Sequence, residues 1–220
     1  MFTYMQSIPL QLFSIFLCSK IGIFVLTITI KQVLRHKPRI HSKYTYEYTL
    51  FDITCILINS CFVETYFLYK TLIFTQQIEY INIQTPITAL LTYVIDDKLY
   101  TAYHFILHSK PIYKYIHAFH HKIITPYNGY VHGIMEHPLE MIGALFIHFT
   151  ILQFVHSIFT LSKFAVLAHI IVKAIIAILN HSDKIIHSHS IKYSSFAHTL
   201  HHVKRRIHYG QHEFTKLSLG

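Results

Sequence analysis

Long apolar stretches constrain this chain most, because each is about the length that crosses a lipid bilayer. A helix needs about 20 apolar residues to span the hydrocarbon core. Of the 220 residues, 52% are hydrophobic and only 13% are charged. We therefore expect an all-α fold, a polytopic membrane helical bundle forming a single integral-membrane domain over residues 1–220. The predicted spans are approximately residues 8–30, 50–74, 81–103, 139–156 and 160–180.

The charged residues predict how these spans are oriented. The net charge is +9 with histidine neutral, and Lys and Arg fall in short segments that flank the apolar spans. Counting crossings places the segments 31–43 and 104–137 and the basic tail from His181 on one side. Because basic segments favour the cytoplasmic side, we predict that this side is cytosolic. The same distribution explains the positive charge without a nucleic-acid partner, and we expect no nucleic-acid binding.

The three cysteines do not form a recognisable site. Cys18, Cys55 and Cys61 all lie in apolar stretches, and no C-x-x-C pair occurs. Neither a disulfide framework nor a thiolate metal site is predicted, so any metal ion would be held by nitrogen and oxygen. The first apolar run is too long for a cleavable signal peptide and is interpreted as a first spanning helix.

Three histidine clusters predict a metal site. They are His104-Phe-Ile-Leu-His108, His117-Ala-Phe-His120-His121 and His198-Thr-Leu-His201-His202. Positions i, i+3 and i+4 share a helix face, so each cluster is predicted to aim its imidazoles at one point. Eight nitrogens exceed the four ligands of a tetrahedral zinc ion and suit two metal ions of higher coordination number. We favour two irons, with positions left open for dioxygen.

Other histidines lack partners at ligand spacing, and we interpret them as surface or solvated residues. Three of them lie within apolar spans, where a polar residue on a helix surface is the simpler interpretation. The histidines interpreted in this way are His36, His41, His148, His156, His169, His187, His189 and His212.

Segments around the clusters carry a further pattern. The cluster order is H-x3-H, H-x2-H-H, H-x2-H-H, and the flanking segments are Asp96-Asp97 through Tyr103, Pro111 to His117, Thr125-Pro126, His137-Pro138-Leu139-Glu140, Asn180-His181-Ser182 and Tyr209-Gly210. Together they resemble the fatty acid hydroxylase and sterol desaturase superfamily of integral-membrane di-iron oxygenases. The resemblance covers roughly residues 94–212, the predicted catalytic histidine region.

The resemblance implies a set of iron ligands in a histidine-rich helical cap on the cytosolic face. His181 is implied as a ninth ligand, followed by His137, for which a helix-entry residue beside Pro138 is an equal alternative. Asp97 is either a hydrogen-bond partner of a ligand imidazole or an ordinary helix-end charge. Glu64 within a span is either a functional residue, because a charge is expensive there, or a residue near the membrane interface. The eight catalytic ligands implied are His104, His108, His117, His120, His121, His198, His201 and His202.

The function implied is O2-dependent hydroxylation or desaturation of a membrane lipid, either a sterol or a fatty acyl lipid. The cofactor would be two iron ions, with O2 as co-substrate. The chain lacks the G-x-G-x-x-G fingerprint of a dinucleotide-binding domain. Electrons would therefore come from a separate donor of the cytochrome b5 type and its reductase. The endoplasmic reticulum membrane is the expected location.

Three departures from the family pattern keep other functions open. Phe105 stands where Arg is usual, Thr199 where Asp is usual and His208 where Asn is usual. One alternative is a degenerate member that binds metal without turnover. A second is a histidine-rich membrane metal-ion transporter, which predicts histidines inside the spans and facing a pathway. A third is a haem-binding membrane cytochrome, which needs only paired single histidines.

Overall fold

The computed structural model describes residues 2–37, 46–75, 78, 80–185, 187–188 and 193–205, and these are mostly helical, as predicted. The short strands β1 and β2 pair antiparallel, with His187 opposite Ser194. In chain order the elements are α1 (Phe2–Val33), α2 (Leu50–Leu57), η1 (Ile58–Val63), α3 (Glu64–Thr75), α4 (Thr85–Leu107), α5 (Lys110–Ile112), η2 (Tyr113–His117), η3 (His120–Lys122), α6 (Tyr130–Gly133), α7 (Pro138–Phe159), α8 (Lys163–Asn180), β1 (His187–Ser188), β2 (Tyr193–Ser194) and α9 (Ser195–Lys204).

Four helical segments are long and apolar enough to cross a membrane, which indicates a membrane protein. Each lies within a few residues of a predicted span, and a turn at Thr160 to Ser162 joins the last two. The four segments are Leu10–Val33 in α1, Leu50–Thr75 through α2, η1 and α3, Pro138–Phe159 in α7, and Lys163–Asn180 in α8.

The predicted span at 81–103 is the exception. Its helix, α4, runs from Thr85 to Leu107 and is not among the four apolar segments found in the described part of the chain. One face of α4 buries polar residues, and the opposite face exposes large apolar ones, the reverse of a surface helix in water. The buried polar residues are Thr85, Thr88, Thr92, Asp96, Asp97, Thr101 and His104, and the exposed apolar ones include Ile87, Leu90, Val94, Leu99 and Ile106.

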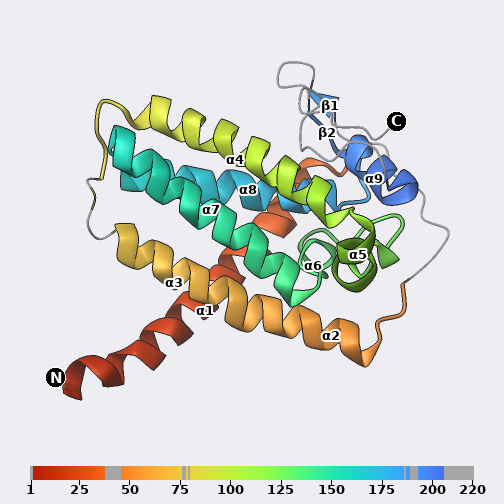
Figure 1. Cartoon of the computed structure of the whole chain (residues 1–220), viewed down its shortest axis with the longest axis horizontal. Helices are drawn as coiled ribbons and strands as arrows, with labels where there is room; N and C mark the ends of the chain where they lie inside the picture. The colour runs from red at the N-terminus through yellow and green to blue at the C-terminus, as the bar shows by residue number, and fades with distance from the viewer. Residues whose placement is uncertain are drawn as a thin grey trace.

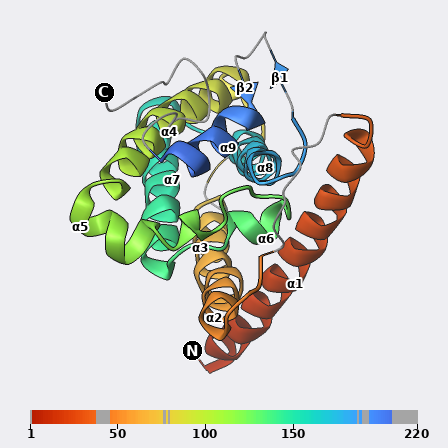
Figure 2. The same ribbon diagram turned by 90° about the vertical axis from the view of Figure 1, so that its right-hand side faces the viewer.

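Helices α4, α7 and α8 lie side by side, with α2 and α3 along another flank (Figure 1). A core of buried apolar side chains joins α7 to α8, and Ile95 of α4 packs against it. Helix α1 runs along the outside of the bundle (Figure 2). Its charged Lys20 contacts Glu64 of α3, and both contact the hydroxyl of Tyr130 in α6. Lys20 in the first predicted span and Glu64 in the second therefore neutralise each other.

The short helices α5, α6 and α9 lie together at one end of the bundle (Figure 1). The ammonium group of Lys184, just after α8, donates to the carbonyl oxygens of Arg35 (3.5 Å) and Lys37 (3.4 Å), just after α1. At the start of α2, Asp52 pairs with Lys122 at 3.1 Å. The basic segment after α1 therefore lies at the same end as the histidine region, as the charge distribution predicts.

Candidate metal centre

Nine histidines meet at this end of the bundle in two groups. Within each group the ligand atoms lie within 4.8 Å of one another. The nine comprise all eight histidines of the sequence clusters together with His181. The five-histidine group contains His104, His108, His117, His121 and His201, and the four-histidine group contains His120, His181, His198 and His202.

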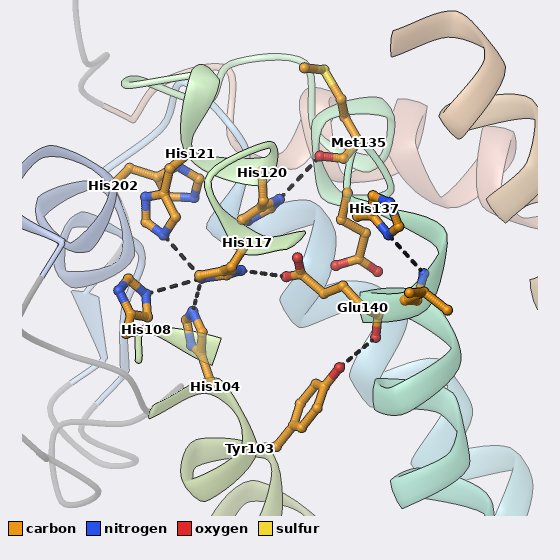
Figure 3. Close-up of polar contacts among 12 residues, drawn as sticks. Tyr103, His104, His108, His117, His120, His121, Met135, His137, Glu140 and His202 are labelled. Carbon is orange, nitrogen blue, oxygen red and sulfur yellow. Dashed lines mark hydrogen bonds and ion pairs between the residues drawn. The ribbon is translucent and has the colours of Figure 1, made fainter. Parts of the chain in front are cut away.

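His117 lies at the centre of the five-histidine group (Figure 3). Its Nε2 lies 3.0 Å from the Nε2 atoms of both His104 and His108, and 3.1 Å from that of His121. The Nε2 of His201 completes the group, 3.1 Å from that of His104 and 3.2 Å from that of His108. All five rings thus present the same nitrogen to one small volume.

The four-histidine group has the same form. The Nε2 of His181 lies 3.4 Å from that of His120 and 3.2 Å from that of His198. The Nε2 atoms of His198 and His202 are 3.1 Å apart. The two groups adjoin, because the ring centroids of His121 and His202 are 4.7 Å apart.

Glu140 holds the other ring nitrogen of His117. Its Oε1 atom lies 2.7 Å from His117 Nδ1, and the residue is only 3% exposed (Figure 3). An ionised carboxylate can only accept, so in that state the Nδ1–H group of His117 donates. Glu140 lies in the first turn of α7, and its backbone carbonyl accepts from the hydroxyl of Tyr103 at 3.0 Å. A carboxylate in this position fixes the tautomer and orientation of a ligand imidazole.

Three further ligands donate the Nδ1 proton to a backbone carbonyl oxygen. With the proton on Nδ1, the Nε2 atom of each carries a lone pair. The Nε2 atoms of His120 and His181, which face each other, are then both acceptors. The three bonds run from His120 to Met135 (3.3 Å), from His181 to Ala177 (2.8 Å) and from His202 to Ile123 (2.9 Å).

This arrangement fits metal ions. An imidazole nitrogen lies about 2.0–2.1 Å from a bound ion such as zinc, so neighbouring ligand nitrogens are roughly 3.0 Å apart in octahedral geometry and 3.4 Å in tetrahedral geometry. The Nε2 separations of 3.0–3.4 Å span these two values. A cation would also relieve the facing lone pairs. Each group could therefore hold one ion, and all-imidazole ligands suit zinc, copper, iron and nickel.

Burial keeps these imidazoles neutral. Desolvation, aided by neighbouring rings and Arg205, lowers the pKa of His108 to about 4, and burial lowers the pKa of His120 to about 4 and that of His181 to about 3. Metal ligation needs the neutral form, so the set is ready to bind at neutral pH. Burial first, and neighbouring histidines second, also lower the pKa values of His117, His121, His198, His201 and His202.

The prediction that each cluster aims at one point is wrong for two clusters. On α9, His198 and His202 belong to the four-histidine group, whereas His201 belongs to the five-histidine group. The second cluster divides in the same way, with His120 apart from His117 and His121. Adjacent helix positions point about 100° apart, so neighbouring histidines can reach two adjoining centres. Only the first cluster, His104 and His108, lies wholly within one group.

His137 and Asp97 do not join the two groups. The Nδ1 atom of His137 accepts from the backbone amide of Leu139 at 3.2 Å, which caps the start of α7. Asp97 is buried on α4, and its hydrogen bond to a ligand imidazole stays a prediction. The hydroxyl of Thr199 bonds back to the carbonyl of Ser195 at 3.4 Å. His41, His189, His208, Tyr209, Gly210 and His212 lie outside the described residues, as does the side chain of His187.

Two histidines predicted on a helix surface lie inside the bundle instead. His148 of α7 contacts Asp96 of α4, and His169 of α8 is only 4% exposed. Asp96, His148 and His169 bring their ligand atoms within 4.8 Å of one another. The sequence did not indicate this group because its members lie on three helices. The sequence signal that could have revealed this group is the charge of Asp96, which lies within an apolar stretch.

A cavity of about 240 Å³ joins these features. It lies among α1, α3, α4, α6, α7 and α8, and most of its lining residues are apolar. Ligands of both histidine groups line it, including His104, His120 and His181. His148 and His169 line it as well. The cavity therefore connects the candidate metal centre with the interior of the helix bundle.

Comparison with known proteins finds no match for this chain among family models, curated proteins or solved structures.

Proposed function

We propose that this chain is an O2-dependent membrane lipid oxygenase, a hydroxylase or desaturase with two iron ions in the two histidine groups. One observation carries the proposal: two adjoining all-histidine groups line a largely apolar cavity inside a bundle of membrane-spanning length. The resemblance of the cluster order and flanking segments to the fatty acid hydroxylase and sterol desaturase superfamily also supports it.

Bound iron would supply dioxygen activation and removal of hydrogen from an unactivated C–H bond. The chain's own residues do different work. The buried imidazoles stay neutral and hold the ions, and Glu140 orients the ring of His117. The apolar walls of the cavity position a lipid chain and exclude water from the reacting carbon.

The substrate class we propose is a sterol or fatty acyl lipid that enters from the bilayer, with O2 as co-substrate. Electrons come from a cytochrome b5-type donor and its reductase. We place the histidine region on the cytosolic face of the endoplasmic reticulum membrane. The basic residues at the same end of the bundle, such as Arg35 and Lys184, support this orientation.

A metal-ion transporter is the second candidate, and one observation favours it. Asp96, His148 and His169 lie beside the cavity at membrane depth, as a transport pathway would require. Lys173 weighs against it, because its ammonium group lies 2.7 Å from Asp96 and places a fixed positive charge on the path. A haem cytochrome is less favoured, since groups of five and four histidines exceed two axial ligands.

Metal analysis of the purified chain in detergent tests the proposal. We expect about two irons per chain, one for each histidine group. His120→Ala and His201→Ala should each lower the iron content, because they remove a ligand from different groups. His156→Ala is the matched control, since His156 lies on α7 outside both groups. About two zinc ions without iron, after expression in iron-rich medium, would contradict the proposal.

Lipid profiling then addresses turnover. A host that expresses the chain together with a cytochrome b5 donor should gain a hydroxylated or desaturated lipid. The same host with His120→Ala should not. An unchanged profile from chains that hold two irons would instead identify a non-catalytic metal-binding protein, as the departures at Phe105 and Thr199 allow.

A further inference from the structure

The interior group around Asp96 has balanced charges. Asp96 is fully buried, contacts the Nδ1 atom of His148, and lies 2.7 Å from the ammonium group of Lys173. That ammonium group also lies 4.8 Å from the ring centroid of Tyr100. Carboxylate and ammonium thus neutralise each other at membrane depth, where an unpaired charge would be costly.

His169 is different, because its polar atoms are buried without partners. The residue is 4% exposed, and neither ring nitrogen has a hydrogen-bond partner among the described residues. Its ring centroid lies 5.9 Å from that of His148, and both rings line the cavity. A buried polar group without partners destabilises a fold. Packing alone therefore does not account for a histidine here.

A neutral imidazole offers one donor and one acceptor, and an alcohol group offers the same pair in return. The Asp96–Lys173 pair leaves no net charge to attract a carboxylate or a phosphate. A divalent cation at this position would lie beside the Lys173 ammonium group, which disfavours a third metal ion. The chemistry that best matches His169 is therefore an uncharged hydroxyl group.

The position of His169 also sets the distance between a hydroxyl group bound there and the candidate metal centre. It precedes the ligand His181 by twelve residues, almost all within α8. At 1.5 Å per residue this is about 18 Å along the helix axis. Apolar residues of α8 between the two histidines, such as Ile170, Ala174 and Ala177, line the cavity.

We propose that His169 binds the hydroxyl group of a neutral lipid whose hydrocarbon part extends along the cavity toward the two histidine groups. The proposal deepens the lipid oxygenase function and rests on it for the fate of the far end of the lipid. The hydroxyl anchor itself is independent of metal and of turnover, so it can be tested by binding alone.

The test uses a photoreactive probe. Hexadecan-1-ol carrying a mid-chain diazirine and a terminal alkyne is compared with the same chain in which a methyl group replaces the hydroxyl. After illumination of the purified protein in detergent, labelling is quantified through the alkyne. We expect the alcohol to label the wild-type chain at least about fivefold more than the hydrocarbon, the effect of one or two hydrogen bonds.

Three variants separate the anchor from the fold. His169→Leu should lose the preference for the alcohol while its labelling by the hydrocarbon is unchanged. It should also fold at least as well as the wild type, because it removes unpartnered buried atoms. His169→Gln, which keeps a donor and an acceptor, should retain much of the preference. His156→Leu, at a histidine in the last turn of α7 that does not line the cavity, should behave as the wild type.

Equal labelling of the wild type by both probes, or an unchanged preference in His169→Leu, would overturn the anchor. So would a third metal ion per chain that is lost in both His169→Leu and Asp96→Asn. Iron counts on the same preparations keep the two proposals apart. A His169-dependent preference for the alcohol in a chain without iron supports the anchor and contradicts the oxygenase. Two irons per chain without such a preference support the oxygenase and contradict the anchor.

Discussion

Glu140 shows how a single side chain can decide the chemistry of a neighbouring one. As a carboxylate it accepts a hydrogen bond from the Nδ1–H group of His117. The lone pair of His117 is then on Nε2, which faces the centre of the five-histidine group. Glu136 lies four residues earlier, and burial raises the pKa of its carboxyl group. The H-P-x-E segment drew attention to Glu140 in the sequence, but only the fold assigns its partner.

Removing this acceptor should weaken metal binding. In Glu140→Leu the ring of His117 loses its fixed orientation, and we expect affinity for the ion of the five-histidine group to fall by about 10–100-fold. Glu140→Gln keeps an acceptor oxygen and should lose less. Equilibrium competition with a chelator measures both. Glu47→Gln, at an exposed carboxylate, is the control, and equal affinities for all four proteins would contradict the role of Glu140.

At the scale of elements, α9 serves two centres at once. His198 and His202 are one helical turn apart and share the four-histidine group, whereas His201 turns toward His104 and His108. In the second cluster, His120 and His121 are neighbours in the 3-10 helix η3 but belong to different groups, and His121 joins His117 of the π-helix η2. Helix periodicity predicted which histidines share a face but not which centre each one reaches.

Substitutions on α9 should therefore separate the two ions. His201→Ala should weaken metal binding in the five-histidine group only, and His202→Ala in the four-histidine group only. The double variant should then lose both ions. Metal content per chain across a chelator titration would show one weakened ion in each single variant. Simultaneous weakening of both ions by either single change would contradict the division.

At the scale of the whole molecule, the fold gathers an unusual number of neutral histidines in one place. His104 and His201 are 97 residues apart in sequence, yet their Nε2 atoms lie 3.1 Å apart. His132 is buried nearby, between the hydroxyl of Tyr48 and the amide of Tyr127, and burial lowers its pKa to about 4. Such a structure is sensitive to acid.

The metal-free protein should lose stability between pH 6.5 and pH 4. In this window the unfolded histidines, with a pKa of about 6.5, take up protons that folded His108, His132 and His181 do not. Stability is therefore full above pH 6.5 and falls as pH falls. The raised pKa of Glu136 acts in the opposite direction but is outnumbered by the histidines.

Thermal unfolding in detergent checks this prediction. Between pH 7.5 and pH 5.5 we expect the apparent Tm to drop by about 4 °C, taking about one pKa unit of lost stability for each of three histidines and subtracting about two units regained at Glu136. The comparison uses one detergent and one ionic strength throughout. A Tm that is unchanged or higher at pH 5.5 would contradict the neutral state of the buried imidazoles.

Sequence alone predicts the four membrane-length helices, the position of Arg35 and Lys37 at the same end as the histidines, and the histidines of the candidate centre. These follow from local properties: apolar length, charge position and residue type. The tertiary structure decided how nine histidines divide between two groups, that α4 turns its polar face inward, and that Asp96, His148 and His169 meet. Those outcomes depend on which faces of separate helices pack together, and the periodicity of any one helix does not record its neighbours.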